Sequence, residues 1–282
     1  MKIAVTGSTG FIGRHLVEKL TARGDEVLAV GRQRLSLGQL RGLDAVVNLA
    51  GEPVAQRWTP AVKRRIHDSR VEGTRYLVAL LAKATRGPRI LVNASAVGFY
   101  GSRGDELLDE SSARGEGFLA GLVEEWEAAA AQAAQSGVRV IMIRLGIALG
   151  PDGGALKKML PAFRAGVGGK LGTGRRWMPW VHIDDVAGLI VHSLDNAAVK
   201  GPVNAVAPVA STNGEFAREL GRVLHRPAWF MVPEFALRAM FGEFGAEMIA
   251  SQHVKPAAAL ESGYQFRFAE LRPALQQILP AP

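Results

Sequence analysis

The chain has 282 residues, of which 48% are hydrophobic, and it contains no cysteine. This composition supports a large buried core and excludes general disorder, disulfides, thiol nucleophiles and cysteine metal sites. The net charge of +8 would suit a nucleic-acid partner, but the basic residues are scattered and no aromatic-interleaved motif accompanies them, so we expect a solvated basic surface and no nucleic-acid binding.

Short apolar runs alternate with helical patterns in the first half of the chain. In order they are KIAVTG, a helix over FIGRHLVEKLTARG, EVLAVG, DAVVNLAG, a long helix from about Pro60 to Thr85, RILVNAS, a helix over residues 117–137, and VRVIMIRLG. Strands that alternate with helices indicate an α/β fold, a Rossmann-like doubly wound parallel sheet. The stretch from Arg32 to Asp44 is too short for a helix plus a strand, so we expect an abbreviated crossover with a short strand near residues 33–35.

Glycine and proline punctuate the chain after Gly150. A short strand is predicted at VNAVAP, and helices are predicted around residues 213–224 and 233–248. Such a half commonly forms a wall above the carboxyl edge of the sheet, where open α/β folds bind ligands. We therefore divide the chain into a dinucleotide-binding core, residues 1–150, and a smaller carboxy-terminal substrate-side lobe, residues 151–282, that is partly interleaved with the core.

Three glycines follow the first predicted strand in KIAVTGSTGFIGRHL. They allow the backbone to turn tightly and to approach a pyrophosphate, whose charge then faces the amides and the positive dipole end of the helix. The alternative is a tight turn with no ligand. The predicted contacts are Gly7, Ser8, Thr9, Gly10, Phe11, Ile12 and Gly13, together with Leu49, Ala50 and Gly51 of NLAG on the adenosine-ribose side.

Arg32 follows the second predicted strand, where an NAD site normally carries an acidic residue. A guanidinium grips a 2′-phosphate, whereas a carboxylate repels it. Arg14, next to Gly13, offers a second cation. The sequence therefore favours NADP(H) over NAD(H), unless Arg32 is only a surface residue.

Several motifs occur together and in order. GSTGFIG, NLAG, NASAVGFYG and WVHIDDVA resemble the extended and atypical short-chain dehydrogenase/reductase superfamily, in particular its epimerase/dehydratase branch. A closer resemblance is to an atypical subgroup with a carboxy-terminal domain of unknown function, which is carried by NLAGEP, RW before a helix with Ser69-Arg70, SAVGFYG, WEAAA, LGPDGGALKKMLP, GRRWMPWVHIDD and RPAWFMVP. The resemblance implies NADP(H) binding and leaves the substrate open.

The catalytic tyrosine and lysine of that superfamily are missing. Its ordinary members carry YxxxK on the helix predicted here at residues 117–137, where Phe118 or Leu119 and Leu122 or Val123 stand instead. None of the three tyrosines of the chain is followed by lysine at this spacing. A proton donor is needed for carbonyl reduction, so the ordinary mechanism does not carry over.

Three residues are candidates for the missing chemistry. Ser95 matches the superfamily's serine at the end of a predicted strand, beside the expected nicotinamide. Tyr100 either donates a proton or is structural. His182 titrates in the right range, and either acts chemically or anchors its loop to Asp184 or Asp185.

Further candidates for substrate binding lie in the second half of the chain. Arg175, Arg176 and Trp177 of GTGRRWMPW suit an anionic or ring-bearing ligand, or else belong to the core. Arg144, in IMIRLG, is either a second anion contact or one half of a buried pair. The six histidines show no ligand-like spacing, and we expect no metal.

Two functions remain open. The first is an NADP(H)-dependent oxidoreductase or epimerase-like enzyme that acts on an unidentified small molecule. The second is a non-catalytic NADP(H)-binding regulator or redox sensor. Because the first strand begins at Lys2 and no long apolar run occurs, we expect no signal peptide and no membrane partner, and hence a cytoplasmic protein. The two long helices of the first half would form a homodimer surface, as the resemblance implies.

Overall fold

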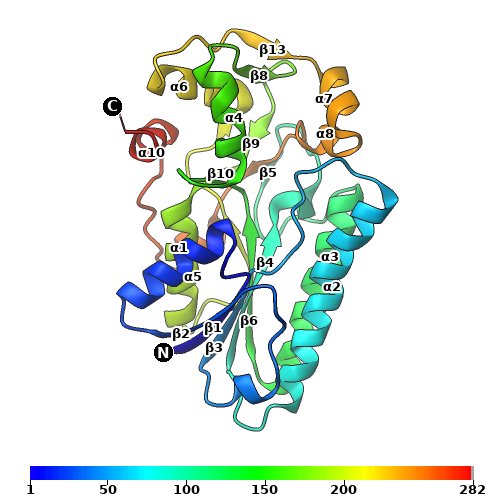
Figure 1. The fold of residues 1–282 in the computed structure, drawn as a ribbon, viewed down its shortest axis with the longest axis vertical. Helices are drawn as coiled ribbons and strands as arrows, with labels where there is room; N and C mark the ends of the chain where they lie inside the picture. Colours follow the sequence, from blue (N-terminus) through cyan, green and yellow to red (C-terminus); the bar gives the residue numbers. More distant parts are fainter. Residues whose placement is uncertain (281–282) are drawn as a thin grey trace.

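A six-stranded parallel sheet forms the centre of the protein in the computed structural model, which describes residues 1–280 (Figure 1). In spatial order its strands are β2 (Glu26–Val30), β1 (Lys2–Thr6), β3 (Ala45–Asn48), β4 (Ile90–Ala96), β6 (Arg139–Leu145) and β11 (Gly201–Ala205). The chain adds β2 on one side of β1 and all later strands on the other side. This reversal creates a crevice at the carboxyl ends of β1 and β3, the place where open α/β sheets bind ligands.

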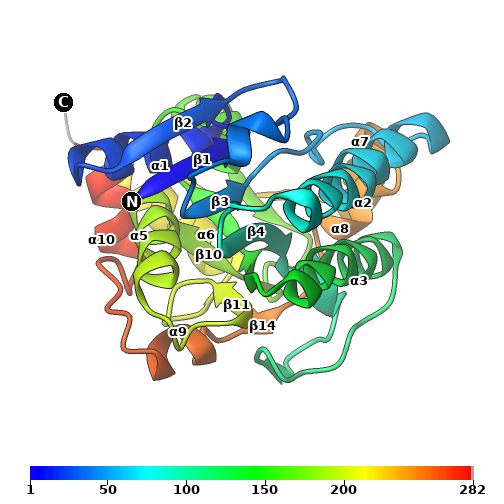
Figure 2. The same ribbon diagram turned by 90° about the horizontal axis from the view of Figure 1, so that it is seen from below.

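Helices cover both faces of the sheet (Figure 2). On one face α1 (Phe11–Ala22) packs on α5 (Ile183–Asp195), and on the other α2 (Pro60–Lys83) packs on α3 (Phe118–Ala131). Side chains of β1 alternate between the two layers, since Ile3 lies with the first pair of helices and Ala4 with the second. The predicted Rossmann-like doubly wound fold is confirmed. No helix within residues 1–280 is both long and apolar enough to cross a bilayer.

The connection from β2 to β3 is abbreviated, but it contains no strand. The short strand predicted near residues 33–35 is wrong, and the chain instead forms a 3₁₀ turn, η1 (Gly38–Leu40). Leu35 and Leu40 are buried in the same core cluster as Leu77 and Leu81 of α2. The irregular segment is thus held by apolar contact with a helix and leaves the outer edge of β2 unpaired.

A lobe with its own apolar core lies above the carboxyl edge of the sheet (Figure 1). Its core is made by α4, α6 and α10, with Phe163, Phe216 and Leu275 among the buried side chains. The elements of the lobe are α4 (Gly154–Arg164), β8 (Gly169–Leu171), β9 (Trp177–Met178), β12 (Ser211–Thr212), α6 (Asn213–Val223), β13 (Phe230–Val232), α7 (Glu234–Phe241), α8 (Phe244–Glu247) and α10 (Leu271–Ile278).

Short elements connect the lobe to the sheet. They are η2 (Val97–Tyr100), β5 (Leu107–Leu108), β7 (Ile147–Leu149), β10 (Trp180–His182), β14 (His253–Val254) and α9 (Ala257–Glu261), whereas η3 (Gln132–Ser136) joins α3 to β6 within the core. β7 pairs with β10, and β5 pairs with β14. Because α5 and β11 belong to the sheet layers although they follow Gly150, the chain passes from the core to the lobe and back.

Asp185 fastens the carboxy-terminal segment to the first turn of α5. Its buried carboxylate accepts hydrogen bonds from the backbone amides of Arg267 (2.7 Å) and Phe268 (3.0 Å), and from the hydroxyl of Tyr264 (3.2 Å). The neighbouring Asp184 makes a more exposed ion pair with the Arg267 side chain at 3.1 Å. The acidic pair of the WVHIDD motif therefore has an architectural function.

We predict that Asp185→Ala lowers the free energy of unfolding by roughly 2–4 kcal/mol, because buried donors lose a charged acceptor. Asp184→Ala is the matched control, and its exposed ion pair should contribute less than about 1 kcal/mol. Urea unfolding of the three proteins measures both effects. Equal losses for the two variants would contradict the assignment.

Candidate active site at the carboxyl edge of the sheet

The glycine turn after β1 contains two glycines that the chain itself requires. Gly7 has a φ of +67°, and a Cβ on it would lie 2.7 Å from the carbonyl oxygen of Leu49. A Cβ on Gly13 would lie 2.2 Å from the carbonyl oxygen of Gly7. Neither position accepts a side chain without movement of the backbone.

Gly10 is less crowded than these two glycines. The only atom close to a Cβ at this position is the Gly7 carbonyl oxygen, 3.1 Å away. Gly10 is also the N-cap of α1, and no side chain caps the helix. The free amides and the positive end of the helix dipole are therefore available to an anion, as the motif predicts.

The end of β2 lies against this turn. The amide of Ser8 donates to the carbonyl of Val30 at 3.2 Å, and a Cβ on Gly31 would lie 3.4 Å from Cγ2 of Thr9. Arg32, the next residue, is exposed. Arg32 therefore follows a strand whose end contacts the glycine turn, so it lies at the same edge of the sheet as this turn.

The start of α1 is also joined to the segment before α4. The Phe11 ring packs against three glycines of that segment, and a Cβ on Gly153 would lie 2.3 Å from its Cδ2 atom. Asp152 accepts hydrogen bonds from Arg14 (2.8 Å) and bonds to His15 (3.0 Å). Arg14, expected as a second phosphate contact, is therefore already paired. The three glycines are Gly150, Gly153 and Gly154.

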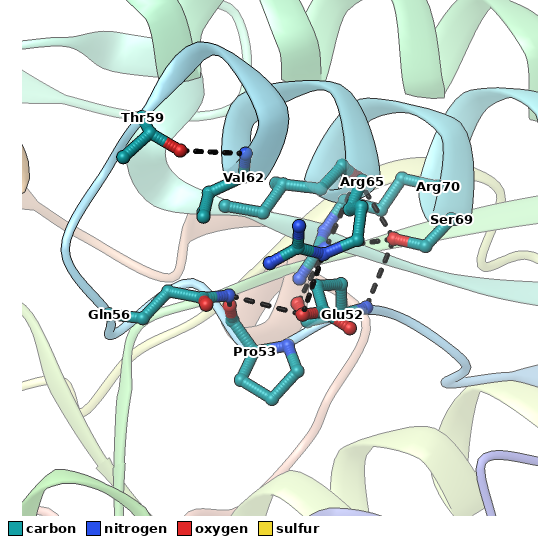
Figure 3. A network of polar contacts seen from close by, with 9 residues as sticks. Glu52, Pro53, Gln56, Thr59, Val62, Arg65, Ser69 and Arg70 are labelled. Atoms are coloured by element: carbon teal, nitrogen blue, oxygen red, sulfur yellow. Dashed lines mark hydrogen bonds and ion pairs between the residues drawn. The ribbon is translucent and has the colours of Figure 1, made fainter.

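Arg70 of α2 holds the loop that follows β3 (Figure 3). It donates to the carbonyl of Glu52 at 2.9 Å, while the Ser69 hydroxyl accepts from the Glu52 amide at 3.0 Å. A Cβ on Gly51 would lie 3.1 Å from Cζ of Arg70, so any larger residue would press on the guanidinium. Burial lowers the pKa of Arg70 to about 10. Arg70 belongs to a motif that carries the family resemblance, but nothing in that motif predicted its position at the cavity.

A cavity of about 650 Å³ lies between the carboxyl edge of the sheet and the lobe. Its lining is mostly apolar and comes from the ends of β3 and β4, from α3 and α4, and from the segment around α8. Of the predicted site residues, it contains Ile12, Leu49, Ala50, Gly51, Ser95, Arg176 and Trp177. Its polar side chains are those of Arg70, Ser95, Lys158, Arg176, Asn213, Glu247 and Gln252, besides the indoles.

Behind this cavity runs a buried chain of polar groups centred on Arg144. Its guanidinium donates to both carboxylate oxygens of Glu127 at 2.8 Å and to the hydroxyl of Tyr100 at 2.9 Å. The Ser95 hydroxyl donates to Glu127 at 2.5 Å, and the Tyr100 hydroxyl donates to the Asn204 side chain at 2.8 Å. Of the two alternatives for Arg144, the structure supports the buried ion pair. The predicted anion contact is wrong, because Arg144 does not line the cavity.

Glu127 was missed in the sequence analysis. It lies four residues after Val123 and next to Trp126, on the apolar face of α3, and its side chain is buried. A lone acidic residue on such a face was a readable signal for a buried partner.

Tyr100 does not reach the cavity, which corrects its assignment as a proton donor. Its side chain is completely buried, and both functions of its hydroxyl are used by Arg144 and Asn204. Burial raises the pKa of Tyr100, although Arg144 opposes the shift. Of the two alternatives for Tyr100, the geometry supports the structural one.

His182 is likewise away from the cavity, so its assignment as a catalytic residue is corrected as well. It caps α5, with Nδ1 accepting from the Asp184 amide at 3.1 Å, and Nε2 bonds to Gln277 at 2.9 Å. The ring is buried, and this burial lowers its pKa. These contacts match the anchoring alternative for His182.

The three candidates for substrate binding in GTGRRWMPW do not all line the cavity. Arg175 lines an outer groove with Lys170 and Arg218 and does not line the cavity, so its assignment to the substrate site is corrected. Arg176 does line the cavity, where it pairs with Glu234 at 2.8 Å. Trp177 is held by a hydrogen bond from its indole to Asp105 (2.8 Å) and by stacking on His253 at 3.9 Å.

Comparison with known families agrees with this architecture. Residues 3–206 match the model of the NAD dependent epimerase/dehydratase family, and residues 232–278 match a domain of unknown function, DUF1731. The chain belongs to the NAD-dependent epimerase/dehydratase family. Within that family it is an atypical short-chain dehydrogenase/reductase, as the motifs predicted.

Family members of similar sequence come from plants, animals and bacteria. The chain is 39% identical to the chloroplastic SDR39U1 homolog of Arabidopsis thaliana, over 99% of this chain and 87% of that protein. It is 36% identical to the epimerase family protein YfhF of Bacillus subtilis, over 99% and 98% of the two chains. The crystal structure of human SDR39U1 with NADPH superposes with a TM-score of 0.94 at 38% identity, over 99% of both chains. MoeE5, solved with UDP-glucuronic acid and NAD, shares the fold at 21% identity.

We predict that Tyr100→Phe lowers the free energy of unfolding by about 1–3 kcal/mol, because Arg144 and Asn204 each lose one buried hydrogen bond, although Arg144 keeps Glu127. Tyr76→Phe is the control, since it removes a hydroxyl that donates to the Leu35 carbonyl from a partly exposed ring. Chemical denaturation compares the two variants. Unchanged stability with lost turnover would instead make Tyr100 a chemical group.

Proposed function

We propose that this family member is an NADP(H)-dependent oxidoreductase that interconverts a carbonyl and an alcohol on a largely apolar small molecule. The observation that carries the proposal is the cavity, which extends from Ile12 of the glycine turn and Gly51 in the loop after β3, past Ser95 at the end of β4, to the lobe. Its mostly apolar lining favours an apolar ring or chain as substrate. Sugar nucleotides would leave many polar groups unpaired there.

The residues present fit a dinucleotide. The uncapped start of α1 and the absence of a side chain at Gly10 suit a pyrophosphate, and the exposed Arg32 suits a 2′-phosphate. A structural relative with a TM-score of 0.94 was crystallised with NADPH, which supports the same cofactor for this chain. NADPH, when bound, supplies the hydride.

The side chains of the cavity provide the surroundings for that transfer. Leu119, Leu122 and Val123 of α3 line the cavity and limit the access of water to it. Ser95 stands at the end of β4 with its hydroxyl proton directed to Glu127, so its oxygen is oriented by α3. In this arrangement Ser95 positions a substrate and does not act as the acid.

A non-catalytic NADP(H)-binding regulator is the second candidate. It is favoured by the sequence of α3, because this helix presents an apolar face to the cavity and contains no tyrosine or lysine. An oxidoreductase would oxidise NADPH in the presence of a suitable substrate, whereas a regulator would only bind it. In the decisive experiment, NADPH oxidation is followed with a panel of aromatic and long-chain ketones and aldehydes, and UDP-sugars serve as the polar comparison.

Oxidation with the apolar probes alone would support the proposed substrate class. If NADPH binds tightly, protects residues 150–282 from protease, and no probe is turned over, the regulator is the better description.

We predict that Arg32→Ala weakens NADPH binding about ten- to a hundred-fold, because hydrogen bonds to a charged group contribute roughly 1.5–3 kcal/mol. NADH binding should be nearly unchanged. Arg34→Ala is the control, since Arg34 lies over the Tyr76 ring. Calorimetric titration measures the constants, and equal losses for both cofactors would overturn the preference for NADP(H).

We predict that Gly10→Val abolishes NADPH binding and leaves the fold largely intact, because the branched side chain enters the space of the pyrophosphate. Gly13→Ala is the contrasting variant: its methyl group meets backbone, so this change should lower stability itself. Circular dichroism melting and NADPH fluorescence titration separate the two effects. Tight NADPH binding by Gly10→Val would contradict the assignment and would mean that the glycine turn only supports the fold.

A further inference from the structure

The cavity has few groups that can release a proton. Ser95 directs its hydroxyl to Glu127, and the Gln252 amide donates to the Val97 carbonyl at 2.9 Å. Lys158 is exposed, and its ammonium donates to the Ala55 carbonyl at 3.1 Å. Two further lining residues are arginines, which remain protonated in proteins.

Glu247 is the single carboxyl group among the cavity-lining residues of the described chain. It ends α8, within the segment that matches the domain of unknown function. Its Oε1 atom lies 3.6 Å from the position of a Cβ on Gly117, the residue that precedes α3. The carboxyl group therefore lies beside the start of the helix whose apolar face lines the cavity.

The surroundings of Glu247 keep it available. Its neighbour Glu243 is exposed and forms an ion pair with Lys63, whereas the Glu247 carboxyl makes no hydrogen bond or ion pair within residues 1–280. Burial raises the pKa of Glu247, and the charge of Lys63 opposes this shift only in part. Arg238 borders the same open depression as Glu247.

Glu247 also lines a second hollow. An open depression of about 450 Å³ is bordered by Trp58, Gly117, Phe118 and Arg238, and it shares the Glu247 side chain with the cavity. A group at the boundary of the two spaces can exchange its proton with solvent on one side and with a ligand on the other.

We propose that Glu247 is the proton-transfer residue of this protein, an inference that rests on the proposed carbonyl–alcohol chemistry. In the reducing direction the carbonyl carbon receives the hydride that NADPH supplies, and the C=O π bond breaks. The oxygen takes the proton of the Glu247 carboxyl group, which gives an alcohol, NADP⁺ and a carboxylate. A proton from solvent, entering through the open depression, restores the acid. Oxidation runs through the same steps in reverse.

The first test needs neither cofactor nor substrate. In protein labelled with ¹³C at the glutamate carboxyl carbons, Glu247→Gln identifies the resonance of Glu247, which is then titrated by NMR. We expect it to titrate above the ordinary glutamate value of about 4.3. A midpoint at or below that value would overturn the proposal, because the group would then hold no proton to give near neutral pH.

The second test measures turnover of any carbonyl probe that is accepted. Glu247→Gln should reduce kcat by about 10²–10⁴-fold, with unchanged NADPH affinity and an unfolding midpoint no lower than that of the unaltered protein. Glu243→Gln, one helical turn earlier, is the matched control and should keep kcat. The rate of reduction in the unaltered protein should fall as pH rises through the pKa of Glu247, because the acid form is then lost.

The outcomes separate the two proposals. If the unaltered protein turns over a probe and Glu247→Gln does so equally well, only the assignment of Glu247 is wrong. If the unaltered protein binds NADPH but oxidises it with none of the probes, the proposed oxidoreductase function fails, and the proton donor fails with it.

Discussion

The buried charge of Arg144 is the constraint on which the carboxyl edge of the sheet depends. A guanidinium inside a protein must be neutralised and hydrogen-bonded, or it destabilises the fold by several kcal/mol. Here Glu127 comes from α3, Tyr100 from η2 and Asn204 from β11, while Arg144 itself lies one residue before the end of β6. One residue thereby fixes the relative positions of a helix, a turn and two strands, and Asn204 extends the network to the carbonyl of Lys255 at 3.0 Å.

This network also explains why few polar groups of the sheet and of α3 are available to a ligand in the cavity. Ser95 donates its hydroxyl proton to the buried Glu127, so only its oxygen can accept a hydrogen bond from a ligand. The buried Glu127 of α3 is bound to Arg144 in the core, and the α3 residues that line the cavity are apolar apart from the indole of Trp126. The polar chemistry of the cavity is left to groups from other elements, among them Arg70 of α2 and Glu247 of α8.

The sequence predicted those features that depend on local patterns. The alternation of strands and helices, the glycine turn and the abrupt change of texture after Gly150 each follow from short-range physics. The partners of buried polar groups could not be read in the same way, because Tyr100 and Asn204 meet across 104 residues. Glu247 was missed for the same reason: nothing in the stretch FGEFGAEM distinguishes a carboxyl group that lines a cavity from its exposed neighbour Glu243.

The packing of Phe11 against the glycine segment has a consequence for ligand affinity. Phe11 begins α1, and the segment that receives its ring leads directly into α4, whose Met159 lines the cavity. An anion at the start of α1 and a molecule against α4 therefore act on one contiguous packed unit. Whatever coupling free energy this contact transmits is reciprocal, so the first ligand changes the affinity of the second by the same factor as the second changes that of the first.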